Sequence, residues 1–509
     1  MAELRRVGSG TTCKIKFSEP IPNFQPRFES FYMCLDGCKK GFLGGCRPFI
    51  VVDGCHLKTK YGGQLLVAVG RDPNDQYFPL AFAVVENECK ETWRWFLTLL
   101  LDDIGDMQTN RWVFISDQQK GLLLVFDEIL EGVEHRFCLR HLYNNYKKKF
   151  RGGVLIRDLM MAAAKATYYQ AWEAKMEELK KINQEAHNWL VKIPTKCWCK
   201  HAFSSYPKCD VVMNNLSESF NSTILLARDK PILTMMEWIR TYLMSRFANL
   251  REKVSKYQGD VMPKPRNRLN REIERSGNWM VVWAGGDKFE VTQGFTMEKF
   301  VVDLKQLSCT CWFWELVGIP CRHVVTAINY RLEEPENYVH RFYKKAAYQR
   351  CYGEQISPIN GQPMWPKTNS QPILPPSYKT PAGRPRKLRR READETVSHS
   401  KINRRNLKMK CTRCDQFGHN IRGCKSQPKK TIGVKTRIRK QSSKRKGPAG
   451  TRIAPPMETS NNSSTSNTPG AGTRGMAPTL GSQHSNNPLP RACECVKTLY
   501  CNVKWTTLL

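Results

Sequence analysis

Three segments of the sequence are the strongest indicators of its fold: RPFIVVDG (47–54), QLLVAVG (64–70) and FPLAFAVVE (78–86). Each segment is a short run of apolar and β-branched residues that ends at turn residues. Runs of this length and composition are typical of buried strands. The sequence therefore predicts three successive strands in a folded region.

The next segments alternate between helix and strand patterns. TWRWFLTLLLDDIG (92–105) has helical length and periodicity, and Thr92 is its expected N-cap. WVFISD (112–117) predicts a fourth strand, QKGLLLVFDEIL (119–130) a helix behind it, and EHRFCL (134–139) a fifth strand. Three strands, helix, strand, helix, strand is the order of an RNase H-like core, so we expect an α/β fold of this kind.

Helical patterns dominate from about residue 141 to 260, which predicts a helical insertion after the fifth strand. A small α+β region follows, with strand-like segments at 279–292 and 299–311. Residues 361–385 are rich in Pro, and residues 447–490 are rich in Ser, Asn, Thr, Gly and Pro. Such compositions bury too little apolar surface to offset ordering entropy, so we expect linkers and a disordered tail there.

The charge of the chain points to a polyanionic partner. Its 509 residues include 81 Lys and Arg against 46 Asp and Glu, a formal charge of +35. Residues 379–446 alone hold 24 basic and 4 acidic residues. No apolar stretch of about 20 residues could span a bilayer, and the N-terminus lacks the apolar run of a signal peptide. We expect nucleic acid, and not a membrane, as the partner.

Three acids form a candidate metal site. Asp53 lies on the first predicted strand and Asp117 ends the fourth, and these strands are neighbours in an RNase H-like sheet; Glu218 comes from a later helix. Three carboxylates can hold two divalent ions, Mg²⁺ or Mn²⁺, that activate an attacking oxygen and stabilise a leaving one. Each acid also has an ordinary interpretation: a turn at Asp53-Gly54, an N-cap at Asp117, and a solvated helix residue at Glu218.

SCTCWFWELVGIPCRHVV supplies Cys309, Cys311, Cys321 and His323 in a Cys-x-Cys-x9-Cys-x-His pattern. Three thiolates and one imidazole close a tetrahedral shell, as a structural zinc requires. The spacing resembles the SWIM-type zinc finger. The alternative is four buried side chains without metal. We interpret the other cysteines of this chain as reduced thiols and not as a disulfide framework.

A second zinc pattern lies in MKCTRCDQFGHNIRGCK, where Cys411, Cys414, His419 and Cys424 resemble a CCHC zinc knuckle. Metal binding and folding coincide in modules of this size. Phe417 and Ile421 are expected to meet unstacked bases, so single-stranded nucleic acid is a further expected partner.

The basic segment PAGRPRKLRRR (381–391) resembles an AT-hook, whose Arg-Pro core can lie in a narrow minor groove. A nuclear-import signal explains the same residues, and the two interpretations are compatible; both imply the nucleus. The candidate DNA-binding residues are Arg384, Arg386, Lys387, Arg389, Arg390 and Arg391.

Several blocks together resemble the plant Mutator-like transposase family, and the resemblance runs from about residue 15 to 345. They are VVDGCHLKTKYGGQLLVAVG, WVFISDQQKGLLLVF, HRFCLRHLYNN and WCKHAFSSYPKCDVVMNNLSESFNS. The resemblance implies a catalytic triad at Asp53, Asp117 and Glu218. Cys138 and His141 match the family's Cys-x-x-His pair, with either a local structural role or contacts to DNA or metal. It also accounts without metal for Cys197, Cys199, His201 and Cys209, which otherwise suggest a third metal site.

Family members usually carry a further N-terminal region with DNA-recognition modules, and this chain begins at what looks like the end of it; we therefore expect a truncated or decayed copy. The expected division is a remnant of the N-terminal region at 1–44, the transposase domain at 45–260, the SWIM-type region at 261–345, a Pro-rich basic linker at 346–408, the knuckle at 409–426 and a disordered basic and polar tail at 427–509.

Two classes of function follow from the resemblance. The first is a DDE-type transposase that cleaves and transfers DNA strands, acts on transposon ends and target DNA, and forms a homo-oligomer. It would use two structural Zn²⁺ ions, and Mg²⁺ or Mn²⁺ at the triad. The second is a nuclear DNA-binding regulator of the far-red-response type, or an inactive relic, without catalysis. An RNA-binding zinc protein is the third and least favoured possibility.

Overall fold

The computed structural model describes residues 1–18, 25–105, 110–150, 153–367, 372–376, 378, 411, 414–417, 419 and 424. Residues 1–394 belong to one compact unit and residues 395–491 to another.

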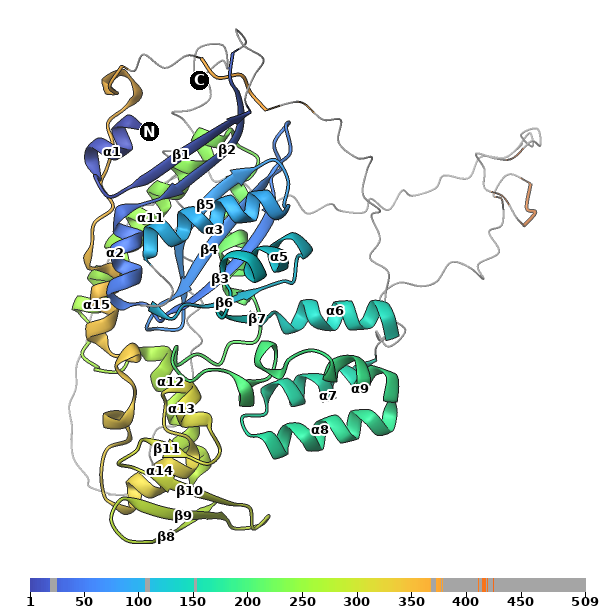
Figure 1. The fold of residues 1–509 in the computed structure, drawn as a ribbon, viewed down its shortest axis with the longest axis vertical. Helices are drawn as coiled ribbons and strands as arrows, with labels where there is room; N and C mark the ends of the chain where they lie inside the picture. The colour runs from blue at the N-terminus through green and yellow to red at the C-terminus, as the bar shows by residue number, and fades with distance from the viewer. Residues whose placement is uncertain are drawn as a thin grey trace, which may run out of the picture. The chain divides into compact units, whose positions relative to one another are not determined.

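The first unit is built on a seven-stranded sheet, ordered β1-β2-β5-β4-β3-β6-β7 (Figure 1). β3, β4 and β5 pair antiparallel, whereas β3 pairs parallel with β6 and β6 parallel with β7. The strands are β1 (Thr12–Ser18), β2 (Arg27–Cys34), β3 (Phe49–His56), β4 (Gln64–Arg71), β5 (Tyr77–Val85), β6 (Val113–Ser116) and β7 (Glu134–Phe137).

The five predicted strands and the two helices between them are all present. The helices are α3 (Lys90–Ile104) and α5 (Lys120–Ile129). The N-cap prediction at Thr92 is wrong: the N-cap is Cys89, and Thr92 lies in the first turn. Its hydroxyl accepts a 3.1 Å hydrogen bond from the Cys89 backbone N–H. Thr92 thus provides a hydrogen-bond acceptor for the backbone N–H of the N-cap residue, as in a capping box.

Two strands and two helices were not anticipated from the sequence. β1 and β2 extend the sheet beyond β5, since Phe31 pairs with Val84 and Tyr32 with Ala83. Helices α1 (Ala2–Val7) and α2 (Asp36–Gly45) flank them. The region expected as an N-terminal remnant therefore contributes to the same sheet as the predicted core.

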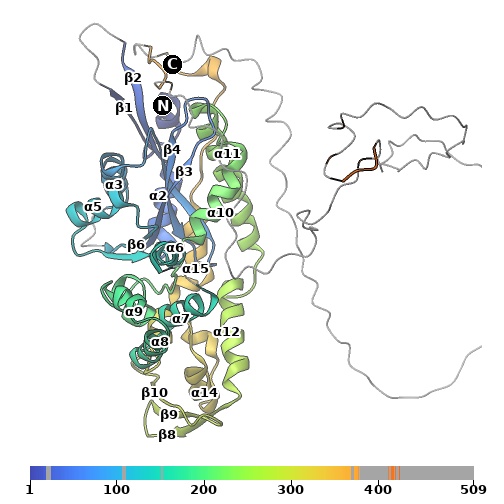
Figure 2. The same ribbon diagram turned by 90° about the vertical axis from the view of Figure 1, so that its right-hand side faces the viewer.

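Helices cover both faces of this sheet. Figure 2 shows α3 and α5 on one face and α10 (Asn215–Thr223) and α11 (Ile232–Ser255) on the other. The strands are apolar on both faces, as expected for a sheet covered on both sides: β4 and β5 are buried along nearly their whole length. Phe220 of α10 and Ile239 of α11 belong to the same core as the strands. This packing holds α10 against strands that are far from it in the sequence.

The predicted helical insertion follows β7. It comprises α6 (Leu139–Phe150), α7 (Val154–Lys165), α8 (Tyr169–Ile182) and α9 (Gln184–Val191), with the short turns η1 (Thr195–Cys197) and η2 (Lys200–Ala202). Its core includes Trp198 and is shared with Leu316 and Val325 of the region beyond α12 (Pro263–Ser276). The insertion therefore packs on the small α+β region that follows α12 as well as on itself.

The small α+β region contains a separate four-stranded sheet, ordered β11-β10-β9-β8. Its elements are β8 (Trp279–Trp283), β9 (Lys288–Gln293), β10 (Lys299–Asp303), β11 (Ser308–Cys309), α13 (Phe313–Val317) and α14 (Arg322–Tyr330). The turns η4 (Pro335–Tyr338) and η5 (Arg341–Tyr343) and helix α15 (Lys345–Gly353) follow. α15 returns to the large sheet, where Cys351 lies against Gly41 and Gly45 of α2 so closely that a Cβ at either glycine would collide with it.

Every cysteine in the described part of the chain is a free thiol. Within that same part, no helix combines the length and the apolar character needed to cross a bilayer.

Candidate functional site

Asp53 lies within β3, so the interpretation of Asp53-Gly54 as a turn is wrong. Its side chain is held from α10: Oδ2 accepts hydrogen bonds from Ser217 Oγ at 2.9 Å and Asn221 Nδ2 at 3.1 Å. Ser217 and Asn221 are four residues apart and share one helix face. Burial raises the pKa of Asp53 to about 6, the Ser217 hydrogen bond opposes this, and the nearby Asp117 carboxylate adds to it.

Asp117 directly follows β6, the parallel neighbour of β3. Ends of parallel neighbours meet at one edge of a sheet, which brings Asp117 into electrostatic contact with Asp53. The interpretation of Asp117 as an N-cap is wrong, because Gln119 is the N-cap of α5 and its side chain accepts from the Leu122 N–H at 2.7 Å. Within the described part of the chain, Asp117 Oδ1 accepts one hydrogen bond, from the Gln119 N–H at 3.2 Å.

A further acid, Glu88, lies at this edge and was not singled out from the sequence. Burial raises its pKa to about 7, and the charges of Asp117 and Asp53 push it in the same direction. A Cβ on Gly54 would lie 2.9 Å from Glu88 Oε2. The strand order offered a signal: β3, β5 and β6 run in the same direction, so the residues after β5 reach the edge that holds Asp53 and Asp117.

Glu218 lies on α10 directly after Ser217, but its carboxylate is paired with the Arg140 guanidinium of α6. Both side chains are partly exposed, 41% for Glu218 and 46% for Arg140. Among the described residues, only two Cys/His groups place their ligand atoms within 4.8 Å of one another, and the three acids are not among them. The structure thus brings Asp53 and Asp117 together and leaves Glu218 beside them in an ion pair.

Cys138 and His141 lie at the start of α6, close to the two aspartates. Burial is the largest single influence on the pKa of Cys138 and acts to raise it, but the hydrogen bonds with His141 and Asn214 and the charge of His141 together lower it. The same hydrogen bond raises the pKa of His141, with Asp117 and Asp53 adding to it. Cys138 Sγ also accepts from the Asn214 N–H at 3.3 Å, just before α10. The pair therefore links α6 to the helix that carries Ser217 and Glu218.

The first predicted zinc site forms a compact group. The ligand atoms of Cys309, Cys311, Cys321 and His323 all lie within 4.8 Å of one another, and all four residues are buried. Cys311 Sγ and Cys321 Sγ are 3.5 Å apart, and Cys321 Sγ and His323 Nδ1 are 3.7 Å apart. A tetrahedral zinc with bonds of about 2.3 Å to sulfur and about 2.0 Å to nitrogen needs ligand atoms separated by roughly 3.5–3.8 Å. The donor set and its spacing fit zinc.

The second predicted zinc site, in the other unit, also gathers its four ligands. Cys411, Cys414, His419 and Cys424 have ligand atoms within 4.8 Å of one another. Cys414 Sγ lies 3.2 Å from His419 Nε2, and the exposed Phe417 side chain leaves 61% of its surface open. Ile421 and the AT-hook-like residues Arg384, Arg386, Lys387, Arg389, Arg390 and Arg391 lie outside the described residues.

The third suggested metal site is not formed in the described structure. Cys199 and Cys209 are fully buried in two different cores, and the His201 ring packs at a tilt against Trp172, with the ring centroids 5.1 Å apart. Cys209 Sγ accepts a hydrogen bond from Arg71. Cys199, His201 and Cys209 therefore contribute to packing, in keeping with the family resemblance, which accounts for them without a metal.

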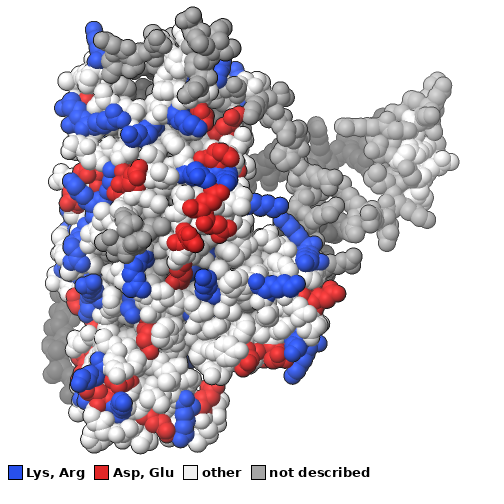
Figure 3. All heavy atoms as spheres, viewed as in Figure 1, with Lys and Arg blue, Asp and Glu red and all other residues white. Residues whose placement is uncertain are grey.

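The chain's basic surplus is not gathered on the face shown in Figure 3, where Lys and Arg alternate with Asp and Glu. Because 24 of the 81 basic residues fall between 379 and 446, the largest concentration of charge lies in sequence outside the seven-stranded sheet.

Two family models match the chain. The MULE transposase domain matches residues 49–145, a range that contains Asp53, Glu88, Asp117, Cys138 and His141. The SWIM zinc finger matches residues 289–332, which contain all four ligands of the first zinc group. A search of curated proteins gave no match. Transposase domains of this kind imply DNA binding in general. With a MULE transposase domain followed by a SWIM zinc finger, the chain matches the Mutator-like transposase family.

Proposed function

We propose that the protein is a DDE-type transposase that cleaves and transfers DNA strands with the help of Mg²⁺ or Mn²⁺. The main support for this proposal is that Asp53 and Asp117 lie near each other, on and directly after two parallel neighbouring strands. Two hydrogen bonds from α10 to the Asp53 carboxylate add to this support. The sheet order β5-β4-β3-β6-β7, with helices on both faces, supports an RNase H-like assignment of this core.

Asp53, Asp117 and Glu218 would hold the ions. Their oxygen donors suit hard divalent cations. Asp53 and Asp117 repel each other at one partly buried edge, and a cation there would relieve that repulsion. The Glu218–Arg140 pair is partly exposed, and pairs of this kind contribute only about 0–1 kcal/mol. Loss of the Glu218–Arg140 ion pair would therefore cost little free energy if Glu218 were to bind a metal ion instead.

The residues of the chain have distinct roles in this proposal. Bound ions would lower the pKa of an attacking water or hydroxyl and stabilise the leaving oxygen. Ser217 and Asn221 orient the Asp53 carboxylate from α10. Arg140, released from Glu218, is placed to contact a DNA phosphate. Trp93, whose indole N–H donates to Glu88 at 3.2 Å, holds the additional acid at the edge of the site.

The second candidate is a transposase-derived DNA-binding regulator, or a relic, that no longer cleaves. The ion pair of Glu218 with Arg140 favours it, since this pair keeps the third acid apart from the two aspartates. Two zinc sites and a basic segment are sufficient for such a protein. In both candidates we propose a nuclear protein that functions as a homo-oligomer, with the CCHC group as a zinc knuckle that contacts single-stranded nucleic acid.

The test is cleavage of a supercoiled plasmid that carries the DNA flanking the gene. We expect nicking that requires Mg²⁺ or Mn²⁺ and disappears in Asp53→Ala, Asp117→Ala and Glu218→Ala. Asp158→Ala is the matched control, because this acid is exposed on α7 and pairs only with its neighbour Arg157. DNA binding without metal-dependent nicking would exclude the enzyme and leave the regulator or relic.

A further inference from the structure

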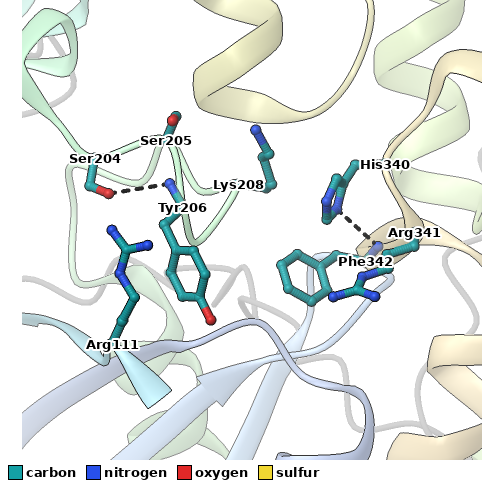
Figure 4. Close-up of a pocket in the computed structure, with 8 residues that line it drawn as sticks. All are labelled: Arg111, Ser204, Ser205, Tyr206, Lys208, His340, Arg341 and Phe342. Carbon is teal, nitrogen blue, oxygen red and sulfur yellow. Dashed lines mark hydrogen bonds between the residues drawn. The ribbon is translucent and has the colours of Figure 1, made fainter. Parts of the chain in front are cut away.

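A second site lies away from the carboxylates. It is a pocket of about 310 Å³ between the large sheet and the segment that follows the zinc finger (Figure 4). Arg111 reaches it from the start of β6, and residues 204–208 reach it from the loop between η2 and α10. Residues 340–342 close it from η5. The lining consists of Arg111, Ser204, Ser205, Tyr206, Lys208, His340, Arg341 and Phe342.

None of these eight residues is acidic, and two arginines and one lysine are among them. Arg111 and Arg341 are exposed and form no ion pair with any described residue. Burial lowers the pKa of Lys208, whose Nζ donates to the backbone carbonyl of Glu315 at 2.7 Å. Burial, together with the charges of Lys208, Arg341 and Arg47, lowers the pKa of His340 to about 4. The pocket therefore has a positive potential with little internal compensation, which suits an anion.

The polar groups that complement the cations suit a phosphate. Ser204 Oγ accepts from the Tyr206 N–H at 3.2 Å, which leaves its own hydroxyl proton free to donate. Arginine guanidinium groups match the oxygens of a phosphate in pairs. The volume is close to the lower bound of about 300 Å³ for ligand pockets, and is suited to one nucleotide unit rather than a larger ligand.

Two aromatic rings lie beside the cations. The Arg111 guanidinium is 4.4 Å from the centroid of the Tyr206 ring, and that of Arg341 is 5.8 Å from the centroid of the Phe342 ring. Tyr206 leaves 38% of its surface exposed. Exposed rings next to basic groups are the arrangement by which proteins stack a base while they hold its phosphate.

The wall of the pocket is built by the zinc-finger region. Gly318 follows α13 with φ +79, and a Cβ there would lie 2.8 Å from His340 Cβ and 3.3 Å from Lys208 Cβ. The His340 N–H donates to the Gly318 carbonyl at 2.8 Å. Glu315 Oε1 in turn accepts from the N–H of the zinc ligand Cys309. A folded zinc finger thus fixes Lys208 and His340 at close range.

The pocket is separate from the carboxylate edge. Arg111 precedes β6 and Asp117 follows it, so the two lie at opposite ends of one strand. Six residues at about 3.3 Å each correspond to roughly 20 Å. A nucleic-acid strand can span this distance with a few nucleotides, which allows one DNA molecule to reach both sites.

We propose that this pocket binds a phosphate group of a DNA strand through Arg111, Arg341 and Lys208, with an adjoining base stacked on Tyr206 or Phe342. The proposal rests on the proposed function for DNA as the partner, but not on cleavage.

The test measures binding of a fluorescein-labelled 12-nucleotide single strand and its duplex to the full-length protein by fluorescence anisotropy, from 50 to 200 mM salt. We expect Arg111→Gln/Arg341→Gln to weaken binding about tenfold at the lower salt and to reduce the salt slope by about 1–2, since each lost phosphate contact removes about 0.9 from it. Tyr206→Ala should weaken binding of the single strand without changing the slope.

Arg157→Gln/Arg271→Gln is the matched control, because both arginines are exposed, lie on α7 and α12 outside the pocket, and remove the same charge. Arg111→Lys/Arg341→Lys keeps the charge and should restore most of the affinity, which guards against a folding defect in the glutamine variant. Equal effects of the pocket and control variants would overturn the proposal.

Two further comparisons are needed. The first distinguishes a DNA phosphate from a free anion, and the second distinguishes failure of the pocket proposal from failure of the proposed catalysis. If inorganic phosphate or deoxythymidine monophosphate binds with pocket-dependent affinity while DNA affinity is the same in the pocket and control variants, the ligand is a free anion and the proposal fails. If the wild type never nicks DNA but Arg111→Gln/Arg341→Gln still weakens DNA binding, the proposed catalysis is refuted and the proposed phosphate site is supported.

Discussion

Ser217 Oγ donates a 2.9 Å hydrogen bond to Asp53 Oδ2 and joins residues 164 positions apart. The same hydroxyl lies 2.6 Å from Asn214 Oδ1, just before α10. Both Ser217 and Asn214 are buried, so a helix that follows a long insertion is tied through them to the strand that carries the first aspartate. The orientation of Asp53 therefore depends on the position of α10.

Ser217→Ala is expected to lower the free energy of unfolding by about 1–3 kcal/mol, because a buried carboxylate loses a hydrogen-bond donor. It should also raise the pKa of Asp53, since the Ser217 hydrogen bond is the main influence that lowers it. Urea denaturation measures the first effect. Ser219→Ala is the control: Ser219 is exposed on the same helix and bonds only to a backbone carbonyl. Equal destabilisation by both variants would contradict the role assigned to Ser217.

The stability of the wild type relative to Asp53→Asn should fall as the pH rises from about 4 to about 7. The folded-state pKa of Asp53 is about 6, above its ordinary value of 3.8, so the folded state holds this proton more tightly than the unfolded chain. Stability is then present at low pH and lost as the carboxyl ionises. A shift of this size corresponds to a change of about 3 kcal/mol. Urea denaturation at several pH values gives the difference.

The variant is needed for that measurement because other buried groups titrate in the opposite sense. Burial lowers the pKa of His135 to about 3, so its contribution to stability grows as the pH rises toward 6.5. Subtraction of the Asp53→Asn profile removes such groups from the comparison. A difference that is flat between pH 4 and 7 would contradict the burial of Asp53 against Asp117.

The strands of the core were predictable, because β3, β4, β5 and β6 are short apolar runs with clear boundaries. Both zinc groups were predictable for another reason, since their ligand spacings are local. β1 and β2 were missed because their alternation is weak and they had been assigned to a remnant. Their place in the sheet depends on pairing with β5, a contact between residues about 50 positions apart that leaves no local signature.

Side-chain contacts between distant segments could not be predicted from the sequence. The Glu218–Arg140 ion pair joins residues 78 positions apart, and it depends on how α6 and α10 pack. Glu88 is an intermediate case. Its approach to Asp53 follows from strand direction alone, once three strands are known to run the same way, and reasoning from the sheet edge could have found it.

Glu88→Gln is expected to raise the stability of the protein at pH 8 and to leave it nearly unchanged at pH 4, below the ordinary pKa of the carboxyl. The folded-state pKa of Glu88 is about 7, above its ordinary 4.5, so ionised Glu88 is disfavoured at the edge while the protonated form is tolerated. Thermal unfolding at the two pH values tests this. Glu91→Gln is the control, since Glu91 is exposed in the first turn of α3 and its pKa is lowered. Destabilisation by Glu88→Gln at pH 8 would contradict the expected repulsion.

The purified protein should contain about two zinc ions per chain by mass spectrometry of its metals. Cys309→Ala and Cys411→Ala should each remove one ion, because their ligand groups lie in different units. Only Cys309→Ala should lower the melting temperature of the first unit, since Cys309, Cys311 and Cys321 belong to a core with Val302 and Val324. One zinc ion per chain in the wild type would refute one of the two sites. Loss of both ions in one variant would refute their independence.

Asp75→Asn should lower the free energy of unfolding by roughly 3–5 kcal/mol, because it leaves buried guanidinium groups without their counter-ion. Asp75 binds Arg47 at 2.5 Å, Arg71 at 2.9 Å and Arg268 at 3.2 Å, and these arginines hold the pKa of its carboxyl well below the usual range. The backbone of Asp75 has φ 56, which asparagine adopts readily, so the variant tests charge alone. Asp158→Asn, in an exposed pair, should change stability by less than about 1 kcal/mol. Equal urea midpoints for the two variants would show that the Asp75 network, which joins β4 to α12, does not hold the sheet to the zinc-finger region.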